Sequence, residues 1–156
     1  MSGHLPDQQD RILQKLLIDL GLATDGENNP LQAWPCFVGL MPDDDSIPDN
    51  CITATATAGR PHGKVATGLN FEKFGVQLKF RSAGPSDGFV KASVVLRDLC
   101  LVRNMTVSIA QTAGTATNNY NIQGVMPNGT VVRLGPDQTN RTYSWSLNLL
   151  MTIQPT

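Results

Sequence analysis

Residues 74–103 predict a strand, a tight connection and an amphipathic helix in direct succession. Apolar and polar residues alternate at the start of this stretch, and Val76, Leu78 and Phe80 share one side. A two-residue period is typical of a β-strand with one buried and one wet face. The first part of the stretch is therefore a strand that needs another layer of structure to cover its apolar side.

The connection and the helix come next. Residues 84–88 are turn formers, and the side chain of Ser86 or Asp87 can accept hydrogen bonds from the first free amides of a helix. Apolar residues then recur at spacings of three and four, which gathers them onto one stripe. We expect a helix at 86–103 that lies on one face of a sheet. The stripe consists of Phe89, Ala92, Leu96, Leu99 and Cys100.

A second amphipathic helix is expected at 5–21. Pro6 and Asp7 suit its first turn, and Gly21 can adopt the left-handed conformation that ends a helix. The polar residues at 22–31 form a connection with little reason to order itself. The apolar stripe of this helix consists of Ile12, Leu13, Leu16, Leu17 and Leu20.

The remaining apolar runs predict strands. Asn128-Gly129 is a strong signal for a two-residue hairpin, which would return through Thr130–Leu134. The small side chains at 51–58 bury little surface, so this strand is expected at an edge. The clearest strand alternates through Tyr143, Trp145, Leu147, Leu149, Met151 and Ile153. The others are Trp34–Met41, Cys51–Ala58, Met105–Ala110 and Tyr120–Met126.

The chain has 156 residues, enough for one domain that buries on the order of 70% of the surface of its unfolded form. We expect a single α+β domain over residues 1–156. Its sheet is mixed, mostly antiparallel and twisted, with two helices packed on one face and long loops. The strands at 105–154 complete it.

Composition excludes some classes of function. The formal net charge is -1, so the chain lacks the basic excess of a nucleic-acid binder. Cys36, Cys51 and Cys100 are odd in number and lack CxxC spacing, which favours buried thiols in a reducing compartment. The first twenty residues do not form a signal peptide, and no apolar run is long enough to span a bilayer. We therefore expect a soluble protein made in a cytoplasm, with no membrane contact.

An acidic loop is expected between Pro42 and Asn50. Its clustered carboxylates suggest a cation site, but the spacing of a calcium loop and its closing Glu are absent. The sequence favours a solvated acidic loop and predicts no metal site. The loop contains Asp43, Asp44, Asp45 and Asp49.

A long glycine-studded loop is expected at 59–74, because this stretch shows no convincing period. Gly63 and Lys64 suggest a phosphate loop, but Val65 stands where a metal-binding Ser or Thr is required. We therefore expect no bound nucleotide and no cofactor. The candidate docking residues of this loop are Arg60, His62, Lys64, Phe71 and Lys73.

One motif suggests an enzyme. Residues 84–88 match GxSxG between a strand and a helix, the setting of a hydrolase nucleophile. In that fold the acid and the histidine follow the serine, whereas His4 and His62 both precede Ser86. A role for Ser86 as a helix cap explains the same residues, so we predict no catalytic residues and no enzyme.

The order of the predicted elements is helix, strand, acidic loop, strand, long loop, strand, helix and three or four strands. With this order the chain resembles the tail terminator proteins of long-tailed bacteriophages, which are also called minor capsid proteins. The resemblance spans nearly the whole chain. It rests on FVGLMPD at 37–43, VQLKFR at 76–81, SDGF at 86–89, LGPD at 134–137, NR at 140–141 and WSLN at 145–148.

The resemblance implies a structural subunit of the virion tail that is assembled in the cytoplasm of a bacterial host. Six copies close into a ring on the finished tail tube, stop its growth and offer a surface to the head connector protein. DNA passes through without specific binding, and the loops at 43–49 and 59–74 are candidates for the lumen or for docking. The alternatives are a head-to-tail connector or neck protein and, with less support, a small serine hydrolase.

Overall fold

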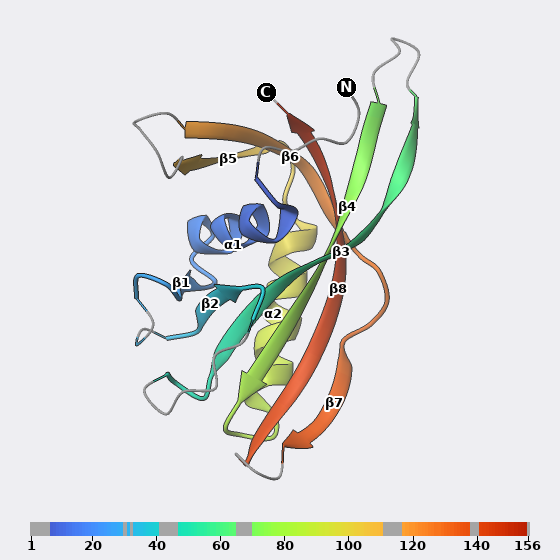
Figure 1. Ribbon diagram of the computed structural model, residues 1–156. Helices are drawn as coiled ribbons and strands as arrows, with labels where there is room; N and C mark the ends of the chain where they lie inside the picture. Colours follow the sequence, from blue (N-terminus) through green and yellow to red (C-terminus); the bar gives the residue numbers. More distant parts are fainter. Residues whose placement is uncertain are drawn as a thin grey trace.

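The computed structural model shows an α+β fold with two helices and a curled, mostly antiparallel sheet of eight strands (Figure 1). The predicted fold class is confirmed at this level. The structure describes residues 7–29, 31, 33–40, 47–64, 70–110, 117–137 and 141–155. Only the backbone is described at 59–64, 70–72, 136–137 and 155.

The helices are α1 (Gln9–Asp19) and α2 (Asp87–Cys100). The strands are β1 (Thr24–Asp25), β2 (Pro35–Val38), β3 (Cys51–Lys64), β4 (Asn70–Ser82), β5 (Met105–Ala110), β6 (Thr117–Pro127), β7 (Val132–Asp137) and β8 (Thr142–Pro155). Their order in the sheet is β1-β2-β3-β4-β8-β6-β5, and β7 also pairs with β8. Among the described strands, β1 and β2 are parallel, as are β2 and β3. Every other paired couple of strands runs antiparallel.

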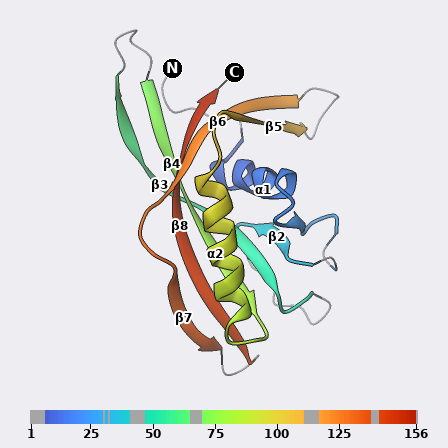
Figure 2. The ribbon, with the colours of Figure 1, turned by 180° about the vertical axis from the view of Figure 1, so that it is seen from behind.

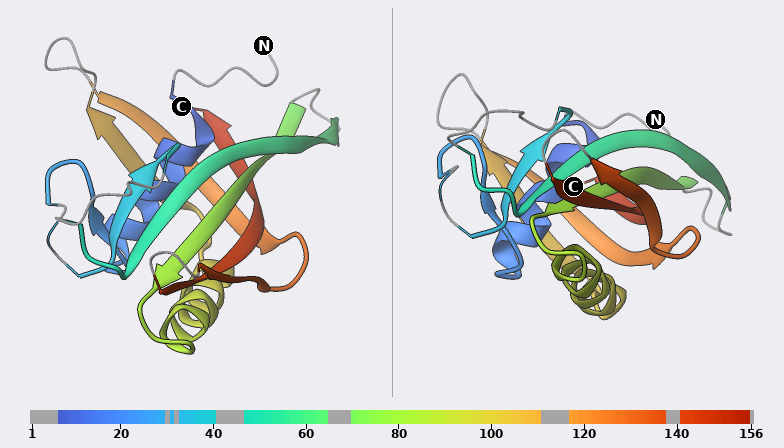
Figure 3. Two further views of the ribbon diagram at one scale, coloured as in Figure 1. Left: turned by 60° about the horizontal axis from the view of Figure 1, so that its bottom comes forward. Right: turned by 90° about the horizontal axis from the view of Figure 1, so that it is seen from below.

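Three long strands, β3, β4 and β8, form the centre of the sheet and twist along their length (Figure 3). Val76, Leu78 and Phe80 of β4 are fully buried, as the alternation predicts. The six alternating apolar residues of β8 also lie on the buried side, and only Tyr143 remains half-exposed. Apolar residues of both helices join these strands in one core cluster, which is the single hydrophobic core of a domain.

The expected loop at 59–74 is wrong for the residues that the structure describes, and 65–69 lie outside them. Residues 59–64 belong to β3 and 70–74 to β4, an antiparallel pair in which Arg60 lies opposite Lys73 and His62 opposite Phe71. β3 also has β2 and β4 as neighbours, so it is not an edge strand. The pairing contains two register shifts, and a bulge breaks the side-chain alternation from which a strand is recognised.

The expected hairpin at Asn128-Gly129 is also wrong. β6 and β7 run in the same direction along one edge of β8, where Pro127 pairs with Leu149 and Val132 pairs with Ser146. The Asn128 amide donates to the Asn148 carbonyl at 2.8 Å, so the ladder nearly continues across the interruption. Gly129 has a φ of +109° and lies in the short interruption between β6 and β7, where the chain does not reverse its direction.

Helix α1 ends as predicted. Gly21 has a φ of +73°, its amide donates to the Ile18 carbonyl, and the Leu22 amide donates to the Leu17 carbonyl. These two bonds satisfy carbonyls that the last turn leaves free. The polar segment that follows is more ordered than expected, because it contains β1 and a turn in which Asp25 accepts hydrogen bonds from Glu27, Asn28 and Asn29.

The buried stripe of α2 differs from the predicted one. Gly88, Ala92, Val95 and Leu99 are buried, whereas Phe89 is 50% exposed. Compared with the predicted orientation, the helix is rotated about its axis, and its close approach to β8 explains this rotation. A Cβ at Gly88 would lie 2.5 Å from the indole ring of Trp145, so only glycine permits this contact.

The cap of α2 also differs from the prediction. Ser86 occupies the N-cap position, but its side chain makes no capping hydrogen bond. The fully buried hydroxyl of Ser82 instead accepts from the Gly88 amide at 3.0 Å and donates to the Gly84 carbonyl at 2.7 Å. The last residue of β4 therefore fixes the start of α2.

We expect Ser82→Ala to lower the free energy of unfolding by about 1 to 2 kcal/mol, because it leaves a buried amide and a carbonyl without a partner. The matched control is Ser86→Ala, which should cost less than about 0.5 kcal/mol at an exposed site. Urea unfolding of both variants measures the difference. A larger loss for the Ser86 variant would contradict this assignment of the cap.

The segment before α1 is attached to β6. The hydroxyl of Tyr120, a residue that is only 1% exposed, donates to Asp7 Oδ2 at 2.6 Å and accepts from the Asp7 amide at 3.0 Å. Asn118 Nδ2 donates to the same carboxylate oxygen at 3.0 Å. Burial, together with the hydrogen bond to the Asp7 carboxylate, raises the pKa of Tyr120 to about 12.

This raised pKa predicts a pH dependence of stability. The folded state holds the Tyr120 proton more tightly than the unfolded state, so the stabilisation is complete below pH 10 and is lost as the pH rises towards 12. Near neutral pH we expect Tyr120→Phe to cost about 1 to 2 kcal/mol. The difference between the wild-type and variant unfolding free energies should shrink from pH 10 upwards. A constant difference would contradict the raised pKa.

Candidate functional site

The structure describes part of the predicted acidic loop. Asp43, Asp44 and Asp45 lie outside the described residues, and Asp49 lies inside them. The guanidinium of Arg81 on β4 donates to the backbone carbonyls of Pro48 and Asp49, at 3.4 and 3.3 Å. The end of the loop next to β3 is therefore attached to β4 through its backbone.

The predicted docking residues lie on paired strands. Arg60, His62 and Lys64 belong to β3, and Phe71 and Lys73 belong to β4. Lys73 is the only one of the five whose side chain is described, and its Nζ atom lies 3.5 Å from Met126 Sδ. These positions therefore form the far end of a long hairpin, and not a separate loop.

The residues of the GxSxG motif lie far from His62. Ser86 is exposed at the start of α2, next to the last residue of β4. His62 pairs with Phe71 near the first residue of β4. The positions Phe71 and Ser82 are eleven residues apart on this strand, which corresponds to roughly 35 Å. The backbone geometry thus gives Ser86 and His62 no way to share a proton.

A polar surface lies on the side of the sheet opposite Val76, Leu78 and Phe80. Strand register places Thr53, Lys79 and Ser146 in one row across β3, β4 and β8. We call this surface the polar sheet face. Its polar residues with described side chains are Thr53, Thr55, Thr57, Lys73, Gln77, Lys79, Arg81, Ser144, Ser146, Asn148 and Thr152.

The polar sheet face carries positive charge. Lys73, Lys79 and Arg81 lie at alternate positions of β4, and none of the residues that define the face is acidic. No ion pair joins Lys73 or Lys79 to a described residue. The alternating threonines of β3 are the sequence signal for this face. From the sequence they are interpreted only as evidence of a strand.

Thr53 has an unusual environment on this face. It is only 4% exposed, and its Oγ1 atom has no hydrogen-bond partner among the described residues. A buried hydroxyl without a partner costs free energy that a methyl group does not. Thr53 is thus a polar residue that does not stabilise the isolated chain through its hydroxyl.

We expect Thr53→Val to leave the free energy of unfolding unchanged or to raise it by up to about 1 kcal/mol. The matched comparison is Ser82→Ala, which removes an equally buried hydroxyl that has two partners. Chemical unfolding of the two variants provides the measurement. A marked loss of stability for Thr53→Val would mean that the hydroxyl has a partner outside the described residues.

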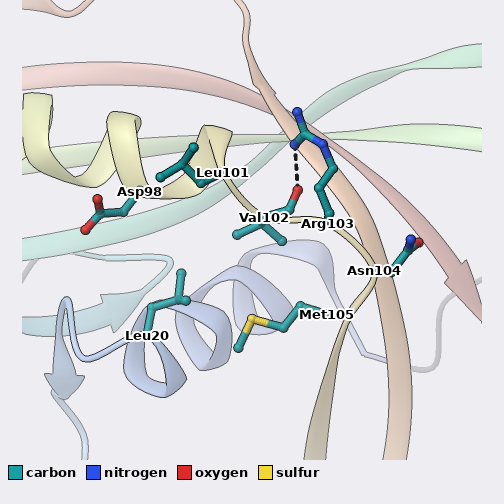
Figure 4. Close-up of a pocket in the computed structure, with 7 residues that line it drawn as sticks. All are labelled: Leu20, Asp98, Leu101, Val102, Arg103, Asn104 and Met105. Atoms are coloured by element: carbon teal, nitrogen blue, oxygen red, sulfur yellow. Dashed lines mark hydrogen bonds between the residues drawn. The ribbon is translucent and has the colours of Figure 1, made fainter.

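A second feature is an apolar groove where the two helices end (Figure 4). Leu20 at the end of α1, Leu101 at the end of α2 and Met105 at the start of β5 meet there around a volume of about 560 Å³. We call it the helix-end groove. Its lining residues are Leu20, Asp98, Leu101, Val102, Arg103, Asn104 and Met105.

Arg103 supports the end of α2 beside this groove. Its Nη1 atom donates to the carbonyls of Cys100 at 2.9 Å and Val102 at 2.7 Å, the second of which is drawn in Figure 4. A cation at this position satisfies free carbonyls at the negative end of the helix. No local sequence pattern indicates this groove, because Leu20 is far in the chain from the other lining residues, which lie within 98–105.

The thiols of Cys36 and Cys51 are buried. Burial raises the pKa of Cys36 to about 12 and also raises the pKa of Cys51. A protonated thiol is neither a nucleophile nor a metal ligand at neutral pH. Within the described ranges, no three His, Cys, Asp or Glu side chains gather as a metal site would require.

The sequence was compared with protein-family models and with curated proteins. A scan against protein-family models finds no match, and a search of curated proteins finds none.

The two helices are also short. Neither α1, with 11 residues, nor α2, with 14, reaches the length of a membrane span, and no other described segment is a helix of that kind. Among the described residues, the polar sheet face and the helix-end groove are two surface features that could contact other molecules.

Proposed function

We propose that this chain is the subunit of a bacteriophage tail terminator. In this role, copies form a ring, six in the related family, on the end of the tail tube. The ring stops polymerisation of the tube protein and provides the joining surface for the head connector protein. The protein is assembled in the cytoplasm of the bacterial host and remains in the virion tail.

The polar sheet face is the observation that carries the proposal. We propose that both helices pack on the opposite face, which leaves the exposed residues of this one available for contact, whereas Thr53 and Ser146 are buried. The core cluster, which contains apolar residues of both helices, supports this arrangement, as does Figure 2, where α2 lies in front of the long strands. A structural subunit needs a broad contact surface of this kind, whereas an enzyme needs a concave site with converging reactive groups.

The order of the elements also supports the proposal. Helix α1 precedes four strands that lead to α2, and four more strands follow. Apart from the two-residue β1, which the sequence did not predict, this is the order of helices and strands on which the resemblance to tail terminators rests. The GxSxG motif gives no competing support for a hydrolase, because the chain brings Ser86 and His62 to opposite ends of β4.

Charge suggests how the subunit is oriented in the ring. The net charge of -1 suits a ring through which DNA passes without being held. Lys73, Lys79 and Arg81 would retard phosphates if they lined the passage. We therefore propose that the polar sheet face points away from the DNA and meets an acidic surface of the tail tube or connector.

The proposal is tested by deleting the gene from its phage and viewing the particles by negative-stain electron microscopy. A terminator predicts overlong or unjoined tails, because nothing ends tube growth. Complementation with Lys73→Gln/Lys79→Gln should restore fewer joined particles than the wild type, and Lys15→Gln on the surface of α1 is the control. Tailless filled heads would point to a neck protein instead, and normal particles would refute both roles.

A further inference from the structure

Helix α2 exposes large apolar residues at both of its ends. Phe89 and Val90 in its first turn are 50% and 57% exposed, and Leu101 at its C-terminal end is 73% exposed. The core does not explain these residues, since they lie outside the buried stripe of the helix. Exposed apolar groups that gather at defined places mark contact sites.

The two ends differ in shape. The first turn presents Phe89 as a projection beside the buried Gly88, whereas the other end forms the helix-end groove. The groove volume of about 560 Å³ is within the range of pockets that hold compact apolar groups. A phenylalanine side chain is such a group.

The two ends also differ in charge. The start of α2 is the positive end of its macrodipole, and the groove lies at the negative ends of both α1 and α2. Asp87 accompanies the projection, and the groove is lined by Arg103 and by Asp98, whose carboxylate is paired with Arg97 at 3.1 Å. An approach of one end to the other therefore joins opposite dipoles and brings a carboxylate towards a guanidinium.

We propose that Phe89 of one copy docks in the helix-end groove of the next copy. This inference rests on the proposed function and specifies the contact that builds the ring. The two surfaces lie at opposite ends of a 14-residue helix, about 21 Å apart. Such a contact is heterologous, so copies joined head to tail close into a ring when the rotation fits and do not stop at a symmetric pair.

A second copy is the favoured occupant because this one chain carries both complementary halves. Each half is apolar at its centre, and Arg103 of the groove can face Asp87 beside the projection. A peptide of the tail tube or of the connector is the competing occupant, which the experiment below separates.

The test is disulfide trapping with the full-length chain. Phe89→Cys and Leu101→Cys are combined in a Cys100→Ser background, because Cys100 is half-buried beside the groove and could cross-link. Cys36 and Cys51 are buried and remain in place. After mild oxidation we expect loss of the monomer band and a ladder of covalent oligomers that ends at one closed species.

Single-cysteine variants show whether the contact is heterologous. Phe89→Cys alone and Leu101→Cys alone should remain mostly monomeric, and an equimolar mixture of the two should give a covalent dimer and no larger species. The control pair is Leu40→Cys with Leu134→Cys, whose parent side chains are exposed elsewhere and should give no ladder. Thermal melting followed by circular dichroism confirms that each variant is folded.

Several outcomes would overturn the inference. A folded double variant that stays monomeric after oxidation, or a control pair that ladders equally well, contradicts the proposed contact. If tails lacking the protein are overlong but the ladder is absent, this contact is wrong and the terminator role stands. If the ladder forms but phage without the gene make normal tails, the contact stands and the terminator role is wrong.

Discussion

Strand β8 supports the fold because both of its edges are used along nearly its whole length. One edge pairs with β4, from Thr152 opposite Lys73 to Tyr143 opposite Ser82. The other edge pairs with β6 and then with β7, which follow one another in the same direction. A strand with two occupied edges leaves few backbone groups free, and the 14 residues of β8 connect the strands on either side of it. The positions of β6 and β7 follow from this pairing.

The same strand positions helix α2. Trp145 of β8 lies against Gly88, and the hydroxyl of Ser82 on β4 binds the amide of that glycine. These two contacts fix where α2 begins along β4 and β8 and how the helix is rotated about its own axis. This rotation buries Val95 and turns Phe89 outwards. A packing constraint inside the protein thus decides which apolar residues remain available at its surface.

Two surfaces with different chemistry result. The polar sheet face combines hydroxyl and amide groups with the cations of β4, and it suits a flat acidic partner. The ends of α2 are apolar and complementary, which suits contact between identical copies. This separation would suit the proposed ring subunit, because contacts with other copies and with other proteins would use different surfaces.

The sequence by itself determined the local elements: the alternation of β4 and β8, the existence of two helices and the stop at Gly21 appear as predicted, although the helices Gln9–Asp19 and Asp87–Cys100 are shorter than expected and α2 buries a different stripe. These features depend on residues that are close in the chain, so their spacing contains the information. Tertiary structure alone decided that residues 59–64 and 70–74 belong to two long strands, that β7 pairs with β8, and that Ser82 caps α2. Bulges and strand partners are set by contacts between distant residues, and close packing at Gly88 selects one rotation of the helix, so no local pattern could reveal them.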